Sequence, residues 1–227
     1  MNAPTGNKPA ASLAALHAVE LSPAYRAIFD QVAPGCAGPE PWRRRKLGAA
    51  HELLALAQVS GRLVIHYLDL TVALRAVFRM TVPVPCRRGG RGPLVVAPAA
   101  QLGLVYRQEA MLTAQNGLSF FEILEPRDVF HANVATSHWP PDAQVGAPSH
   151  SAPRAQMLCL GSQLFPGIKL VDLVLMAYGA LSLQTTQFSL ADPAGVLNPE
   201  AARWFQANAT HIPLTREPFR LNKEVTL

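Results

Sequence analysis

Hydrophobic residues recur at helical spacing in two long stretches of the chain. In residues 41–60, leucines fall on one side of a helix that begins at Pro41 and ends before Gly61, residues that suit the first helical turn and the C-terminal cap. Residues 170–181 also place apolar side chains on one face: Leu170, Leu173, Val174, Ala177 and Leu181. The sequence therefore predicts two amphipathic helices.

A further helix is predicted after Asn198. Asparagine is a favoured N-cap residue, and Pro199 would occupy the first helical position, where its missing N–H costs nothing. One shorter helical piece is expected at residues 13–21, inside an N-terminal stretch that is otherwise rich in alanine, proline and glycine.

Between the two long helices, hydrophobic residues recur at every second position instead of at helical spacing. In residues 74–82, apolar side chains alternate with arginine and threonine, as in a strand with one buried face. Further strands are predicted at residues 63–68, 102–107 and 118–124. Nearby strands without helical crossovers favour an antiparallel meander. The order helix, meander, irregular cysteine-bearing segment, helix, helix predicts an α+β fold.

The composition agrees with one packed domain. Of the 227 residues, 49% are hydrophobic and only 15% are charged, which is enough for a core and argues against global disorder. We expect a partly flexible N-terminal arm over residues 1–40, a main domain over residues 41–212 and a tail over residues 213–227.

We expect neither a membrane span nor a secretory signal in this sequence. Its longest apolar run, residues 168–183, is interrupted by Lys169 and Asp172 and is too short to cross a bilayer comfortably. The N-terminal residues lack a good cleavage site. Three cysteines form neither an even set nor a C-x-x-C pair, so a reduced, cytoplasmic setting is expected.

The formal net charge of +5 is concentrated in residues 43–46 and 87–91. These clusters lack the interleaved aromatic side chains that stack nucleic-acid bases, so a nucleic-acid partner is not expected. They predict either a docking patch for a protein or a solvated basic face.

Cys159 stands near the edge of an apolar run, which breaks after Leu160 into Gly161 and two polar residues. That position would let its sulfur meet another molecule, although cysteine more often acts as a small buried hydrophobe. Cys36 and Cys86 lie in loops rich in proline, glycine or arginine, and we expect both to be structural.

Three segments together resemble the ubiquitin-conjugating enzyme family. They are "DVFHANV" at residues 128–134, "MLCLG" at residues 157–161 and "DPAGVLNPEAARWFQAN" at residues 192–208. The family has a His-Pro-Asn motif, then an aliphatic-Cys-Leu motif, a helix, and a loop of this last type that leads into another helix. The sequence looks closest to divergent bacterial members encoded beside ubiquitin-like and activating-enzyme genes in antiviral defence operons.

The sequence departs from the family pattern in three places. Ala132 replaces the proline of the motif, and an insertion over residues 135–155 lengthens the path from Asn133 to Cys159. The tryptophan usual after the cysteine is absent, with Phe165 near its place.

The resemblance implies a transferase that carries a ubiquitin-like C-terminus as a thioester on Cys159 and passes it to an amine of a target protein. Cysteine suits this chemistry because it is both a strong nucleophile and a fair leaving group. Asn133 would donate to the oxyanion or, equally, organise its loop. His131 would shape the turn, and Asp192 would orient the incoming lysine or cap a turn before Pro193.

The resemblance also implies partners, but no cofactor or metal ion. They are a ubiquitin-like protein, its activating enzyme and the target protein. The basic start of the first long helix, Arg43, Arg44, Arg45 and Lys46, would dock the activating enzyme by charge complementarity.

Three other functions stay open from the sequence. The chain could be an inactive conjugating-enzyme-like binding module, or a cysteine hydrolase that uses Cys159 with His211 and Asp192. A zinc site is the third, with imidazole and thiolate as natural ligands. Its candidate ligands are His131, His138, His150 and Cys159.

Overall fold

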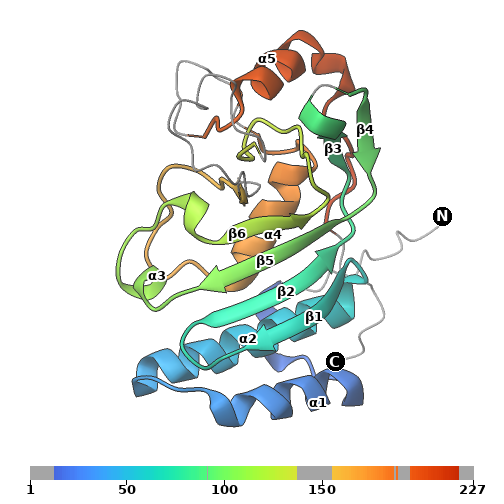
Figure 1. Ribbon diagram of the computed structural model, residues 1–227. Coiled ribbons are helices and arrows are strands. Elements are labelled where there is room, and N and C mark those ends of the chain that lie inside the picture. The colour runs from blue at the N-terminus through green and yellow to red at the C-terminus, as the bar shows by residue number, and fades with distance from the viewer. Residues whose placement is uncertain (1–12, 91, 137–154, 187, 189–194, 220–227) are drawn as a thin grey trace, which may run out of the picture.

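The computed structural model describes residues 13–90, 92–136, 155–186, 188 and 195–219, and it has an α+β fold (Figure 1). Its α-helices are α1 (Pro23–Val32), α2 (Glu40–Ser60), α3 (Glu109–Leu112), α4 (Leu170–Leu181) and α5 (Pro199–Ala207). Its strands are β1 (Leu63–Asp69), β2 (Leu74–Met80), β3 (Val84–Arg87), β4 (Leu94–Ala97), β5 (Ala100–Tyr106), β6 (Phe121–Glu125) and β7 (Gln156–Leu158). Short 3-10 helices are η1 (Leu13–Ala18), η2 (Ala33–Gly35), η3 (Arg88–Gly90), η4 (Gly117–Ser119) and η6 (Ala209–His211).

The predicted antiparallel meander is present as a five-stranded sheet. Its strands are ordered β1-β2-β5-β6-β7, and each neighbouring pair is antiparallel. Residues 118–124 were predicted as one strand, but η4 occupies the first part and β6 begins only at Phe121.

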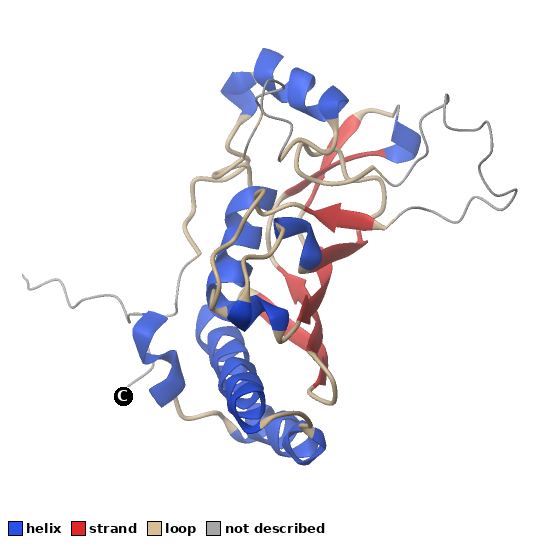
Figure 2. Cartoon of the chain, turned by 90° about the vertical axis from the view of Figure 1, so that its left-hand side faces the viewer, coloured by secondary structure: helices blue, strands red, loops and turns tan. Residues whose placement is uncertain are grey.

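Helices cover one face of this sheet, with α2 and α4 packed beside each other (Figure 2). The alternation seen in the sequence explains which side chains face them. On β2, Leu74, Ala76, Phe78 and Met80 are buried, whereas Arg75 and Arg79 are exposed. The ring of Phe78 meets that of Phe121 edge to face, with centroids 6.4 Å apart.

The predicted helix ends are confirmed where the sequence carried a cap. Gly61 ends α2 in the left-handed conformation, at φ 63°. The side chain of Asn198 accepts from the N–H of Ala201 and thereby caps α5, with Pro199 at its first position.

The N-terminal stretch contains more structure than the sequence predicted. Besides η1 in the expected place, residues 23–32 form α1, which packs on α2. The ring of Phe29 lies edge to face against His51, at 6.0 Å between centroids, and the N–H of Ser22 donates to Gln58 at 2.8 Å. Residues 23–32 are therefore part of the folded body and not of a loose arm.

The β3–β4 hairpin leaves the main sheet after β2 and pairs with the segment before His131. Cys86 forms an isolated bridge with Val129, and the N–H of Phe130 donates to Pro85 at 2.8 Å. Within the described residues, no helix combines the length and the hydropathy needed to cross a membrane.

Candidate active site around Cys159

Cys159 follows β7 and lies directly opposite Asn133. Its main-chain N–H donates to the carbonyl oxygen of Asn133 at 2.8 Å. The adjacent residues continue the pairing through a bridge between Val134 and Leu158. The insertion after Asn133 therefore leaves the motif and the cysteine as neighbours.

The thiol of Cys159 is buried, contrary to the exposed position expected at the rim. The residue is only 3% exposed, and Sγ donates to the carbonyl oxygen of Gly161 at 3.6 Å. Gly161 has φ 125°, which an L side chain rarely adopts, so glycine suits this turn. A large partner can reach the sulfur only after the surrounding structure moves.

Gly117 holds that segment in place. The N–H of Gly117 donates to Gly161 O at 3.0 Å, and the N–H of Leu160 donates to Gly117 O at 3.4 Å. A Cβ on Gly117 would lie 2.5 Å from Gly161 O and 2.8 Å from Leu160 N, closer than van der Waals contact allows. The sequence analysis missed this residue, although the Asn116-Gly117 dipeptide is a turn signal.

His131 organises the turn, as expected. Nδ1 accepts from the N–H of Asn133 at 3.0 Å, so Nε2 carries the proton and donates to Ala180 O at 2.8 Å. Burial lowers the pKa of His131 to about 4, against the opposing effect of the bond to Ala180. The imidazole is neutral at pH 7, and both its nitrogens are used within the fold.

The side chain of Asn133 ties the motif to the segment before α5. Its Nδ2 donates to Gly195 O at 2.5 Å, which is the loop-organising bond that the sequence left as one of two interpretations. Its Oδ1 is buried and has no hydrogen-bond partner in the described part of the chain. One amide hydrogen of Asn133 is therefore bonded to Gly195 O. That the second amide hydrogen donates to an oxyanion stays a prediction.

Ala132, where the family that the sequence resembles has a proline, lies in a turn. The N–H of Val134 donates to His131 O at 3.2 Å, which closes a β-turn around Ala132. The Ala132 carbonyl accepts from the N–H groups of Leu197 and Asn198, at 2.8 and 3.0 Å. The three motif residues therefore join three segments: Cys159 after β7, the end of α4, and residues 195–198, which include the N-cap of α5.

Cys36 and Cys86 are buried, as Cys159 is, and Cys86 lies on β3 rather than in the expected loop. None of the chain's three cysteines, which all lie in the described part, is in a disulfide. Burial raises the pKa of the Cys86 thiol to about 11, so it is almost entirely protonated at neutral pH.

Several candidate residues cannot be placed at this site. Asp192, His138 and His150 lie outside the described residues. His211 is exposed on η6, where its described contacts are with Thr210 and the ring of Trp204. In the described ranges, no three His, Cys, Asp or Glu residues are grouped as a metal site requires.

The basic cluster of α2 divides into two parts. Arg43 and Arg44 are 50% and 80% exposed at the side chain, and both pair with Glu40 on the same helix. Arg45 instead reaches the hydroxyl of Tyr106 and the carbonyl of Ile168, at 3.1 Å in each case. Arg45 thereby fastens α2 to the residues that precede α4.

Lys46 was expected on the exposed docking face, and the structure corrects that placement. The residue is fully buried. Its ammonium donates to Leu70 O, to Ala37 O at 2.7 Å and to Thr71 O at 3.2 Å. An interior ammonium needs such compensation, because burial of an unpaired charge is costly. Lys46 therefore stabilises the turn between β1 and β2 and cannot meet a partner.

Comparisons of the chain with protein-family models, with curated proteins and with solved structures found no match.

Proposed function

We propose that this protein is a conjugating enzyme for a ubiquitin-like protein, with Cys159 as the residue that carries the thioester. The observation that supports this most is the pairing of Cys159 with Asn133, together with the bond from Asn133 Nδ2 to Gly195 O. The three segments on which the resemblance rests thus meet in space, although they are separate in the sequence.

The proposed reaction has two steps. In loading, the Cys159 thiolate attacks the carbonyl carbon of a thioester on the activating enzyme, and that enzyme's cysteine leaves as a thiolate. In discharge, an amine of the target attacks the same carbonyl, Cys159 leaves as a thiolate and the nitrogen loses a proton. The product is an amide, and no cofactor takes part.

The neighbouring residues have distinct parts in this proposal. His131 and Asn133 hold the turn opposite Cys159, because their side chains bond to Ala180 and Gly195. Asp192 is proposed to orient the incoming lysine. The exposed arginines Arg43 and Arg44 are proposed to steer the activating enzyme to α2.

The proposed setting is a reducing bacterial cytoplasm, in antiviral defence. The unpaired state of the chain's three cysteines agrees with a reducing compartment. The link with defence rests only on the sequence resemblance.

One observation favours a second function, an inactive module that binds a ubiquitin-like protein without forming a thioester. Cys159 is 3% exposed, less than a nucleophile needs in the step itself. The two functions differ in a single product, a covalent adduct on Cys159.

The test is loading with an activating enzyme, ATP and the cognate ubiquitin-like protein, read on gels with and without a thiol reductant. Wild type should form a reductant-sensitive adduct. Cys159→Ser should form at most a reductant-resistant ester, and Cys36→Ser and Cys86→Ser should load like wild type. An undiminished thioester in Cys159→Ala would refute the assignment, and binding without any adduct would favour the inactive module.

A further inference from the structure

The β3–β4 hairpin has one edge that the rest of the fold uses and one that it leaves open. On β3, Pro85 O accepts from Phe130 N and Arg87 N donates to Asp128 O at 2.9 Å, so these main-chain groups point toward residues 128–130. Main-chain groups of successive strand residues point to opposite sides. The groups of the intervening residue, Cys86, therefore face β4.

The register of the hairpin then fixes the direction of every main-chain group on β4. Cys86 lies opposite Val95, and Val84 lies opposite Ala97. Val95 and Ala97 consequently direct their N–H and C=O groups to β3, whereas Leu94 and Val96 direct theirs away from it. In the described part of the chain, these outward groups have no hydrogen-bond partner.

The side chains of this open edge are apolar and accessible. Val95 is 55% exposed and Val96 is 51% exposed. Leu94 packs instead toward the cluster that contains Phe130 and Phe205, which anchors the strand to α5. Exposed strand edges are normally shielded by charge, proline or a covering element, because they can pair with another chain. A firmly anchored strand with an open edge is suited to accept one more strand.

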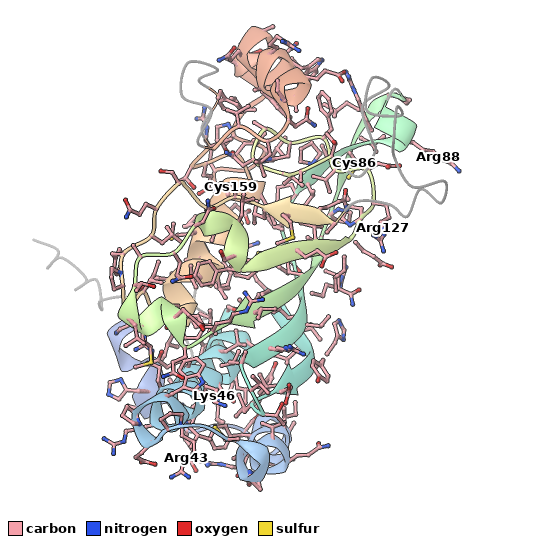
Figure 3. All side chains as sticks on the ribbon, turned by 60° about the vertical axis from the view of Figure 1, so that its left-hand side comes forward. Arg43, Lys46, Cys86, Arg88, Arg127 and Cys159 are labelled. Atoms are coloured by element: carbon pink, nitrogen blue, oxygen red, sulfur yellow. The ribbon has the colours of Figure 1, made fainter. Side chains whose placement is uncertain are left out.

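Positive charge near the tip of the hairpin indicates what kind of strand the open edge would accept. Arg88, at the tip of the hairpin, and Arg127 are both exposed, and Figure 3 shows them on the same side of the molecule. Arg127 precedes Asp128, which bonds to β3 on the side away from β4, so Arg127 adds to the positive charge of this region but does not line the open edge. Neither forms an ion pair in the described part of the chain, whereas Arg87 is already paired with Glu200 at 3.1 Å. With a net charge of +5, a second copy of this chain would meet like charge here.

We propose that the outer edge of β4 is a docking site for an extended, acidic segment of a partner protein, which adds a strand to the hairpin. Main-chain bonds to Leu94 and Val96 would supply affinity, and the two exposed valines would contact apolar side chains. The positive charge of Arg88, with that of Arg127 on the far side of β3, would favour an acidic segment. This site is independent of the proposed thioester chemistry. It also lies at the opposite end of the molecule from Arg43 on α2 (Figure 3).

The test uses the full chain and two synthetic nine-residue peptides. In one, valine and threonine alternate with glutamate, and in the other lysine replaces glutamate. Amide hydrogen exchange in the protein alone should be fast at Leu94 and Val96 and slow at Val95 and Ala97. The glutamate peptide should shift and protect the Leu94 and Val96 amides, and the lysine peptide should bind at least about tenfold more weakly, a difference that added salt reduces.

Two variants separate edge pairing from nonspecific attraction. Val96→Pro removes an outward N–H and leaves the ladder to β3 intact, so it should abolish peptide binding with little change in thermal unfolding. Val96→Thr keeps the N–H and the branched shape and should bind normally. The double variant Arg88→Glu, Arg127→Glu should reverse the preference between the peptides.

Three results would overturn the proposal. One is slow exchange at Leu94 and Val96 in the protein alone, which would mean that this chain already pairs the edge. Another is concentration-dependent dimerisation that Val96→Pro abolishes, which would make a second copy the occupant. The third is equal binding of the two peptides, or undiminished binding by Val96→Pro.

Discussion

The main-chain N–H of Cys159 donates to the carbonyl oxygen of Asn133 at 2.8 Å, so the cysteine and the asparagine motif form one unit of structure. The unit extends further, because the Asn133 side chain bonds to Gly195 and the Ala132 carbonyl bonds to Leu197 and Asn198. A change at any of these residues should therefore alter the structure around the Cys159 sulfur.

Asn133→Ala should lower stability and reduce both half-reactions together. The substitution leaves the Gly195 carbonyl without its donor, at a cost of about 1–3 kcal/mol. Single-turnover loading and discharge, measured beside thermal unfolding, test this. Asn208→Ala is a matched control, because its Nδ2 also donates to a carbonyl, that of Trp204, at the far end of α5.

A different outcome would assign a catalytic role to Asn133. If the variant loads normally, melts near the wild-type temperature and discharges to lysine much more slowly, then the second amide hydrogen of Asn133 serves the oxyanion. Asn133→Asp, which cannot donate, should follow whichever pattern Asn133→Ala shows.

The parts of the fold that the sequence predicted are those where a local signal coincides with the tertiary structure. The helix ends at Gly61 and Asn198 were predictable because the capping residue itself carries the conformational preference. The alternation in β2 was predictable because one face of that strand is buried.

The missed features depend on contacts between distant segments. Arg44 and Lys46 lie two positions apart on α2 and look alike in sequence, yet Arg44 is exposed whereas Lys46 is enclosed by main-chain carbonyls. Helix α1 is stabilised by packing on α2, a contribution that no local propensity records. The close approach of Gly117 to Gly161 likewise exists only in the folded chain.

Gly117→Ala should expose the Cys159 thiol. The added methyl group would displace Gly161 or Leu160, at a cost of about 1–3 kcal/mol for such overpacking. We expect a lower unfolding temperature and faster modification of Cys159 by a thiol reagent, measured in a background where the other two cysteines are serine.

Gly48→Ala is the matched control for that experiment. Gly48 lies within α2, and a Cβ there meets no atom within 4 Å. The substitution should stabilise the protein by up to about 1 kcal/mol through helix propensity and leave thiol modification unchanged. Equal modification rates in Gly117→Ala and wild type would show that Gly117 does not control access to the sulfur.

The basic residues of α2 should separate into docking and structural groups. Lys46→Ala leaves several carbonyls without their donor, including those of Ala37 and Thr71, and should cost on the order of 3 kcal/mol of stability. Arg44→Ala should change stability by less than about 1 kcal/mol, because the side chain is 80% exposed. Chemical denaturation measures both values.

Charge reversal at Arg43 and Arg44 tests docking without disturbing the fold. The double variant should slow loading from the activating enzyme, chiefly through the association rate, and added salt should reduce the difference. Unchanged loading kinetics would mean that these two arginines form only a solvated surface.

His131 should make stability depend on pH in a defined window. Burial lowers the pKa of its imidazole from 6.5 to about 4 in the folded protein, so the unfolded chain binds this proton more readily. The contribution of neutral His131 to the free energy of unfolding is complete above pH 6.5 and is lost as the pH falls toward 4. A shift of this size corresponds to on the order of 3 kcal/mol.

The His131 contribution is isolated by comparing wild type with His131→Gln across this window. The glutamine amide cannot reproduce both bonds of the imidazole, to Ala180 O and from Asn133 N, so the variant should be less stable at pH 7. Its stability should fall less steeply between pH 6.5 and 4, so the two curves converge in acid. His211→Gln, the same substitution at an exposed histidine, controls for the change of residue type. The pKa of His51 is also lowered by burial, so some slope should persist in His131→Gln. Parallel curves for wild type and His131→Gln would mean that His131 is not held neutral by the fold, and its role in the turn would then need another explanation.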